Sequence, residues 1–152
     1  RVIRLVMINV HTPHFRGKAR RYMADSPPRV LLVEDFEDLR KQVSFYLSSR
    51  GYQVLEAPNG RAAIQTALSG KPNFILIDFR LPDMNGVELA RELRKLPQTE
   101  HVPIVGWSAD SRNPQRETLR QAGITEYLEK PIRLKDLDAV IERFAPKLKK
   151  PH

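Results

Sequence analysis

Polar residues stand in the sequence where four separate apolar runs end. Glu34 and Asp35 follow the first predicted strand, Asp78 the third, Ser108 the fourth and Lys130 the fifth. If these strands lie parallel in one sheet, the five side chains meet at one rim, because the ligand site of such a sheet lies beyond the carboxyl ends of its strands. The chemistry to consider is that of three carboxylates, a hydroxyl and an ammonium in one place.

Three crowded carboxylates repel one another unless a cation neutralises them. The chain has no cysteine and no histidine near these positions, so only oxygen ligands are available. Oxygen ligands favour Mg²⁺ or Mn²⁺ over zinc. An Asp beside such an ion can attack phosphorus and form an aspartyl phosphate, a transfer that depends on positioning and charge neutralisation. Lys130 would then offer positive charge to the phosphoryl oxygens, and Ser108 a hydroxyl donor.

Each of these residues also has an ordinary structural explanation. An acidic pair after a strand commonly caps the next helix, and a lone Asp or Ser is commonly a turn residue. A Lys before a Pro is usually a surface charge, and Tyr127 would by itself be a half-buried packing residue. The combination of all of them at strand ends, in this order, is what favours a functional site.

The elements that must position these residues are predicted by apolar periodicity. Runs at 30–33 and 74–77 are typical of strands buried on both faces, and shorter runs predict strands at 52–55, 102–107 and 124–128. Apolar stripes predict helices between them, with the inward residues Phe36, Leu39, Val43, Tyr46 and Leu47; Ala63, Ile64, Ala67 and Leu68; Leu89, Ala90, Leu93 and Leu96; and Leu134, Leu137, Val140, Ile141 and Phe144.

Turn residues separate the predicted elements. Gly51, Gly70 and Gly123 stand where helices would end. Asn59 would cap the second helix, and Asn113-Pro114 would begin the fourth. Five strand–helix units in series imply an α/β domain with a parallel sheet and helices on both faces.

Composition limits the classes of protein to which the chain can belong. The 152 residues are 41% hydrophobic and 29% charged, which is typical of one globular domain with a sizeable core. No apolar run is long enough to span a membrane, so membrane insertion is not expected. The absence of cysteine rules out disulfides and is compatible with a reducing cytoplasm, the location we expect.

The net charge of +8 arises mostly at the N-terminal end of the chain. Residues 1–29 hold six Arg and one Lys against one acidic residue, which leaves a net charge of +2 for the remainder. A basic tail could bind nucleic acid or anionic lipid. We instead expect residues 1–28 to be a disordered basic leader, with Met23 as a candidate start. The domain is expected over residues 29–146, followed by a basic tail at 147–152.

Four stretches of the sequence together resemble the receiver domain of two-component response regulators. They are Val30–Asp35, Ile75–Gly86, Trp107–Ala109 and Tyr127–Pro131. The resemblance runs from Arg29 to Phe144. It implies a flavodoxin-like (βα)5 fold, with a five-stranded parallel sheet of order 2-1-3-4-5 and helices on both faces. Its implied function is that of a phosphoacceptor signalling domain in a phosphorelay.

The resemblance assigns roles to the carboxylates. Glu34 and Asp35 would hold Mg²⁺, with Mn²⁺ as the alternative ion. Asp78 and the backbone carbonyl of Arg80 would complete the protein ligands. Asp78 would also be the phosphoacceptor.

The resemblance also assigns roles to the residues that respond to the phosphoryl group. Lys130 would bind it, and the Lys130-Pro131 peptide bond would be cis. Ser108 would be the switch hydroxyl and Tyr127 the switch aromatic. If Ser108 moves toward the phosphoryl group, Tyr127 can turn inward and change the face made by the fourth helix, the fifth strand and the last helix.

Protein partners follow from the same resemblance. A sensor histidine kinase or a histidine phosphotransfer protein would donate the phosphoryl group, and a downstream protein would bind the changed face. A phosphorylation-dependent homodimer is a further option. No nucleic acid is expected, since only eight residues follow Phe144 and no DNA-reading motif fits among them. A stand-alone receiver of this kind is not a conventional enzyme, although it takes part in its own Mg²⁺-dependent phosphorylation and dephosphorylation.

Other functions remain open. A haloacid-dehalogenase type of enzyme also uses an Asp after a strand, but it needs a second Asp where this chain has Arg80. A degenerate receiver would bind partners without phosphorylation, and only the unusual, bulky Gly106-Trp107 pair before Ser108 favours it. The chain could also be the receiver fragment of a larger response regulator or hybrid kinase, in which a DNA-binding domain would lie elsewhere.

Overall fold

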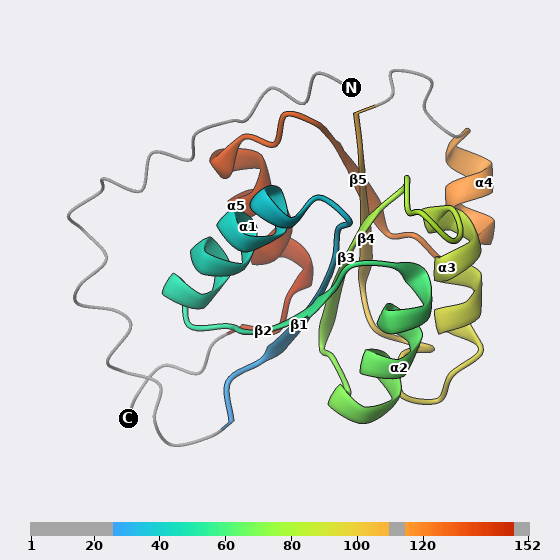
Figure 1. Ribbon diagram of the computed structural model, residues 1–152, viewed down its shortest axis with the longest axis horizontal. Coiled ribbons are helices and arrows are strands. Elements are labelled where there is room, and N and C mark those ends of the chain that lie inside the picture. The colour runs from blue at the N-terminus through green and yellow to red at the C-terminus, as the bar shows by residue number, and fades with distance from the viewer. Residues whose placement is uncertain (1–25, 110–114, 148–152) are drawn as a thin grey trace.

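The computed structural model describes residues 26–109 and 115–147, to which all structural statements below refer. Strands and helices alternate along these residues (Figure 1). The strands are β1 (Arg29–Val33), β2 (Gln53–Ala57), β3 (Phe74–Asp78), β4 (Ile104–Ser108) and β5 (Glu126–Glu129). The helices are α1 (Glu37–Ser49), α2 (Gly60–Gly70), α3 (Gly86–Arg94), α4 (Arg116–Gln121) and α5 (Leu134–Phe144).

All five strands run parallel in one sheet of order β2-β1-β3-β4-β5. This order confirms the predicted flavodoxin-like fold. The chain leaves β1 toward β2 on one side and returns to β3 on the other side, so the strand order reverses between β1 and β3. Ligand sites of such sheets lie beyond the strand ends at this point. Glu34 and Asp35 follow β1 there, and Asp78 ends β3.

Helices cover both faces of the sheet, with α1 and α5 on one face and α2, α3 and α4 on the other (Figure 1). Side chains alternate along a strand. Val30 and Leu32 therefore pack with α1 and α5, in a cluster that we call the α1/α5 layer. Leu31 and Val33 pack with the other helices in the α2–α4 layer. All four side chains are fully buried, which explains the continuous apolar run in the sequence.

Several predicted helix ends are confirmed. The Asn59 side chain caps α2 by accepting a hydrogen bond from the Ala62 N–H at 2.8 Å. Gly51 and Gly123 follow helices with φ angles of 97° and 79°, in the left-handed region that favours glycine. The predicted start of the fourth helix at residues 113–114 lies outside the described residues. Among the described residues, no helix combines the length and apolar character needed to cross a membrane.

One predicted detail of α2 is wrong, although the helix ends at Gly70 as predicted. Leu68 is 43% exposed rather than inward. The helix meets the sheet through the small Ala67, and Leu68 lies about 100° further round the axis. Gly70 is the last residue of the helix, and Lys71 after it takes the left-handed conformation with a φ of 46°. A Cβ on Gly70 would lie 2.6 Å from Leu55 Cδ1, so this glycine allows close packing on β2.

The strands β2, β4 and β5 begin one or two residues later than predicted. The Tyr52 N–H donates to the Leu47 carbonyl and the Ile124 N–H to the Leu119 carbonyl, so both residues complete the turn that ends a helix. Pro103, near the expected start of β4, has no N–H to offer a neighbouring strand. The strand ends that carry the polar residues are unaffected.

A polar cluster joins α1 to α5 within the α1/α5 layer. The Tyr46 hydroxyl donates to Asp138. The Arg50 guanidinium donates to the Tyr46 hydroxyl at 2.7 Å and to Asp138 at 2.6 Å. Burial, together with the bond to the carboxylate, raises the pKa of Tyr46 to about 12. The hydroxyl is therefore a protonated donor throughout the neutral range.

Tyr46→Phe should lower the free energy of unfolding by about 1–2 kcal/mol, because it removes a hydrogen bond to a charged group. Urea denaturation would measure this loss. The control is Phe45→Leu at the neighbouring position, which is 62% exposed. That substitution should change the same free energy by less than about 0.5 kcal/mol. Equal losses in the two variants would show that the cluster has no energetic role.

Candidate functional site

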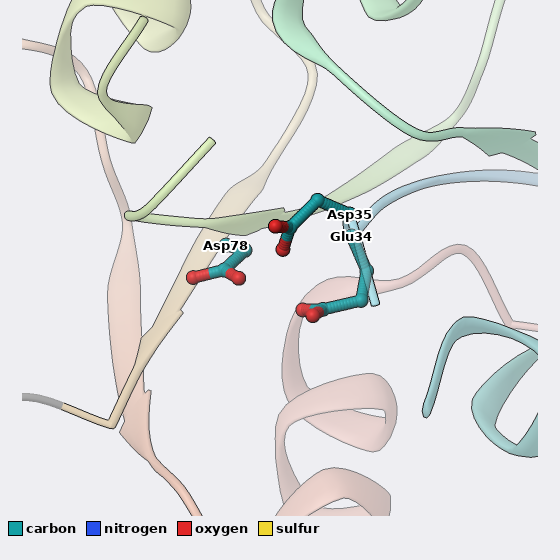
Figure 2. Close-up of side chains that lie close together, drawn as sticks. All are labelled: Glu34, Asp35 and Asp78. Atoms are coloured by element: carbon teal, nitrogen blue, oxygen red, sulfur yellow. The ribbon is translucent and has the colours of Figure 1, made fainter. Parts of the chain in front are cut away.

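Three carboxylates gather where β1 and β3 end. One oxygen from each of Glu34, Asp35 and Asp78 lies within 4.8 Å of the others. Figure 2 shows the three side chains directed toward a common space. Glu34 and Asp78 are 1% and 2% exposed, whereas Asp35 is half-buried and opens the group to solvent. We call these residues the acidic cluster, and the structure brings them together as the sequence predicts.

Lys130 closes the acidic cluster from the side of β5. Its Nζ lies 2.9 Å from Glu34 Oε2 and 3.1 Å from Asp78 Oδ2. The Lys130 N–H donates to the Ser108 carbonyl at 2.7 Å, which fixes the backbone beside β4. The Lys130-Pro131 peptide bond is cis, as the resemblance implied. The Lys130 ammonium thus forms salt bridges with two buried carboxylates.

The electrostatic balance of this group is negative. Burial, then repulsion from Asp78, raises the pKa of Glu34 from 4.5 to about 7, although Lys130 acts in the opposite direction. The Lys130 ammonium pairs with two of the three carboxylates, and a divalent cation would relieve the remaining repulsion. All available donor atoms are oxygens, and two of the three carboxylates are buried. This donor set fits Mg²⁺ or Mn²⁺.

Glu34 has two roles at once. Its Oε1 accepts a hydrogen bond from the Phe36 N–H at 3.3 Å, just before α1 begins. Its Oε2 faces Lys130. One carboxylate oxygen of Glu34 therefore accepts a backbone hydrogen bond at the start of α1, as acidic residues after strands commonly do. The other oxygen lies in the acidic cluster and pairs with Lys130.

Ser108 ends β4 on this rim, whereas Tyr127 lies within the neighbouring strand β5, where it pairs with Gly106. In the strand register Asp78 pairs with Trp107, so Ser108 stands one residue beyond the partner of Asp78. Ser108 is 5% exposed. Tyr127 is half-buried, its hydroxyl donates to Glu129 Oε1 at 3.2 Å, and its ring centroid lies 6.3 Å from that of Phe79. Their switch roles remain predictions.

The loop after β3 turns back over the end of its own strand. The Arg80 N–H donates to Asp78 Oδ1 at 2.9 Å, and Arg80 forms a single antiparallel bridge with Asn85. Asn85 in turn caps α3 by accepting from the Glu88 N–H at 2.8 Å. A Cβ on Gly86 would lie 2.8 Å from the Asp78 carbonyl oxygen, which explains the glycine in this motif. That the Arg80 carbonyl binds metal remains a prediction.

Comparison with known proteins decides the family. Residues 30–142 match the family model of the response regulator receiver domain. The chain belongs to this family. It is accordingly a phosphorylation-based signalling domain of two-component systems. Domains of this family are generally not conventional enzymes.

Three known receivers and regulators show the extent of the likeness. The polar-differentiation response regulator DivK of Brucella anthropi is 31% identical over 70% of this chain and 86% of its own length. The chemotaxis response regulator CheY4 of Vibrio cholerae superposes with a TM-score of 0.72, at 28% identity over 77% of this chain and 98% of that one. The receiver domain of the sensor histidine kinase PA1611 of Pseudomonas aeruginosa gives a TM-score of 0.70, at 32% identity over 78% and 97%. That structure has a magnesium ion coordinated in its active site cleft.

Asp83 contributes to this receiver in a way that the sequence did not predict. Its two carboxylate oxygens accept hydrogen bonds from the Gly60 and Arg61 N–H groups, both at 2.9 Å. Slight burial works against ionisation, but these backbone donors lower the pKa of Asp83 overall. Next to it, Met84 packs so closely that a Cβ on Gly60 would lie 2.5 Å away. The loop after Asp78 is therefore fastened to the start of α2.

Mg²⁺ affinity should rise by about tenfold between pH 6 and pH 8, because a Glu34 with a pKa of about 7 must lose its proton to bind a cation. Because the folded state raises the pKa of Glu34, the protonated side chain stabilises the metal-free protein fully below its ordinary pKa of 4.5. This stabilisation is lost as the pH rises through the folded-state pKa of about 7. Calorimetric titration of Mg²⁺ at several pH values measures the first effect. Glu34→Gln should flatten the profile; a flat profile in the wild type would exclude Glu34 as the titrating ligand.

Asp83→Ala should lower the free energy of unfolding by about 1 kcal/mol, the usual cost of removing a helix cap. The wild-type advantage should be complete above the ordinary pKa of 3.8 and shrink as the pH falls below it, since the folded-state pKa is lowered. Denaturation of both proteins across this pH range tests the assignment. Glu142→Ala, at an exposed position of α5, is the control and should leave stability nearly unchanged. A pH-independent difference for Asp83→Ala would contradict the cap.

Proposed function

We propose that this receiver accepts a phosphoryl group on Asp78 in a Mg²⁺-dependent reaction. The observation that carries the proposal is the position of the Asp78 carboxylate, which lies within 4.8 Å of two other carboxylates and 3.1 Å from the Lys130 ammonium. A nucleophile, a cation site and a fixed positive charge for phosphoryl oxygens thus adjoin one another. Phosphoryl transfer needs little more than such positioning and charge neutralisation.

Glu34, Asp35, Asp78 and the backbone carbonyl of Arg80 would hold the ion, which is Mg²⁺ or, in its place, Mn²⁺. When bound, the ion would neutralise the cluster and the phosphoryl oxygens. Asp35 is the half-buried member, so the donor and the ion would approach from its side. The PA1611 receiver, with magnesium in its active site cleft, supports this assignment.

In the transfer, an Asp78 carboxylate oxygen forms a bond to phosphorus while the bond from phosphorus to the imidazole nitrogen of a donor phosphohistidine breaks. The electron pair of that broken bond stays on the nitrogen. The Arg80 N–H holds Asp78 Oδ1 at 2.9 Å and so orients the carboxylate. Lys130 already contacts Asp78 Oδ2, so a short shift brings its ammonium onto the phosphoryl oxygens.

The response would pass from Ser108 to Tyr127 and then to the face made by α4, β5 and α5. Ser108 would donate its hydroxyl to the phosphoryl group, and Tyr127 would turn inward. A sensor histidine kinase or histidine phosphotransfer protein would be the donor, and a downstream protein, or a second copy of the domain, would bind the changed face. The shift can be no larger than the difference in phosphoryl affinity between the two states.

Incubation with acetyl phosphate and Mg²⁺ should add the mass of one phosphoryl group, which hydroxylamine should remove. Asp78→Asn should take up none, because the attacking oxygen is replaced by an amide nitrogen. Intact-protein mass spectrometry measures both results. Asp136→Asn, at an exposed position of α5, is the control and should label like the wild type. Undiminished labelling of the Asp78→Asn variant would refute the assignment.

A further inference from the structure

Trp107 is the single tryptophan of the chain and has no role in the site described so far. It lies in β4 immediately before Ser108 and is fully buried in the α1/α5 layer. In the sheet it pairs with Asp78 on one side and with Leu128 on the other. The largest side chain of the core is therefore placed directly below the rim on which Asp78 and Lys130 meet.

The indole ring faces the Lys130 ammonium. Lys130 Nζ lies 5.5 Å from the centroid of the Trp107 ring, within the range of a cation–π contact. The same nitrogen binds Glu34 and Asp78. The Lys130 side chain is only 13% exposed, and poor solvation strengthens the attraction of a cation to an aromatic face. The ammonium thus has two carboxylates and an aromatic face as partners.

Packing alone does not explain an indole at this position. Within the described residues, the buried Nε1 of Trp107 has no hydrogen-bond acceptor. An unpaired buried donor costs free energy that a Leu or Phe in the same apolar layer would avoid. What the indole adds over an aliphatic side chain is its aromatic face, and that face is the part which meets Lys130.

We propose that Trp107 is a positioning residue that keeps the Lys130 ammonium over Asp78 during phosphoryl transfer. The inference rests on the proposed function. Oxygens of Glu34 and Asp78 that held a cation or a phosphoryl group would be less available to pair with Lys130. The attraction of the ring does not depend on the state of those carboxylates. It holds the ammonium within reach of the incoming phosphoryl oxygens when the salt bridges no longer do.

The test compares two apolar replacements under acetyl phosphate and Mg²⁺. Trp107→Phe keeps an aromatic face, and its phosphorylation rate should fall by only about two- to threefold. Trp107→Leu fills the layer without such a face, and its rate should fall by about five- to twentyfold. Both replacements remove the indole N–H, so the unpaired donor cannot account for a difference between them. Equal rates in the two variants would overturn the proposal.

A double-mutant cycle separates positioning from general packing. In a Lys130→Met background, the Phe and Leu variants of Trp107 should be phosphorylated at the same slow rate, because the ring has no ammonium left to hold. A defect of Trp107→Leu that persists in that background would show a packing role and overturn the proposal. Thermal unfolding checks that every variant is folded, and Trp107→Met replaces Trp107→Leu if the latter is not.

A second measurement does not require phosphorylation. In the metal-free protein, the indole ring current should shift the ε-methylene protons of Lys130 upfield in the NMR spectrum, and Trp107→Leu should abolish that shift. If the wild type shows no such shift, Lys130 does not contact the Trp107 ring, and the positioning role of Trp107 is overturned. If the shift is present but Asp78 never accepts a phosphoryl group, the proposed function fails and the positioning role with it. The two failures are thereby distinguishable.

Discussion

Mutual repulsion among three carboxylates is the constraint on which this structure depends. The register of β1 and β3 brings Glu34, Asp35 and Asp78 together whether or not their charges are balanced. Lys130 offsets part of the repulsion, but burial first and repulsion from Asp78 second still raise the pKa of Glu34 to about 7. Two apolar layers that clamp the sheet supply the free energy that holds the acidic cluster in this unfavourable arrangement. The stability of the scaffold is thus what creates a binding site for a cation.

The pair Gly106-Trp107, which the sequence marks as unusual for a receiver, has a separate explanation for each residue. Gly106 faces the α2–α4 layer, where a Cβ would lie 2.3 Å from Phe79 Cζ, so the ring of Phe79 occupies the space that a side chain of β4 would fill. Phe79 follows Asp78 directly and packs against Tyr127. Trp107 faces the opposite layer and meets Lys130. The two residues therefore place aromatic rings beside β3 on both faces of the sheet.

How much of the fold and of the site the sequence predicted depends on how far apart in the sequence the interacting residues lie. Buried parallel strands give continuous apolar runs, so the sheet, its helices and the gathering of the polar residues at strand ends could all be predicted. The bond between Tyr46 and Asp138 and the cap of Asp83 on α2 could not, because each joins residues far apart in sequence whose types are common at any surface. The exposed Leu68 was mispredicted because an apolar residue beside an inward Ala is ambiguous until the helix is placed on the sheet.

The opposite end of the sheet limits where a phosphorylation signal can cause movement. Arg94, at the end of α3, donates to the Val102 carbonyl at 2.6 Å and to the Gly123 carbonyl at 3.2 Å. Gly123 follows α4, and a Cβ there would lie 2.4 Å from Arg94 Nε. The guanidinium thus ties the C-terminal end of α4 to the turn that precedes β4. Because the acidic cluster lies at the other rim, the response proposed above would act on the N-terminal end of α4, whereas Arg94 holds its C-terminal end.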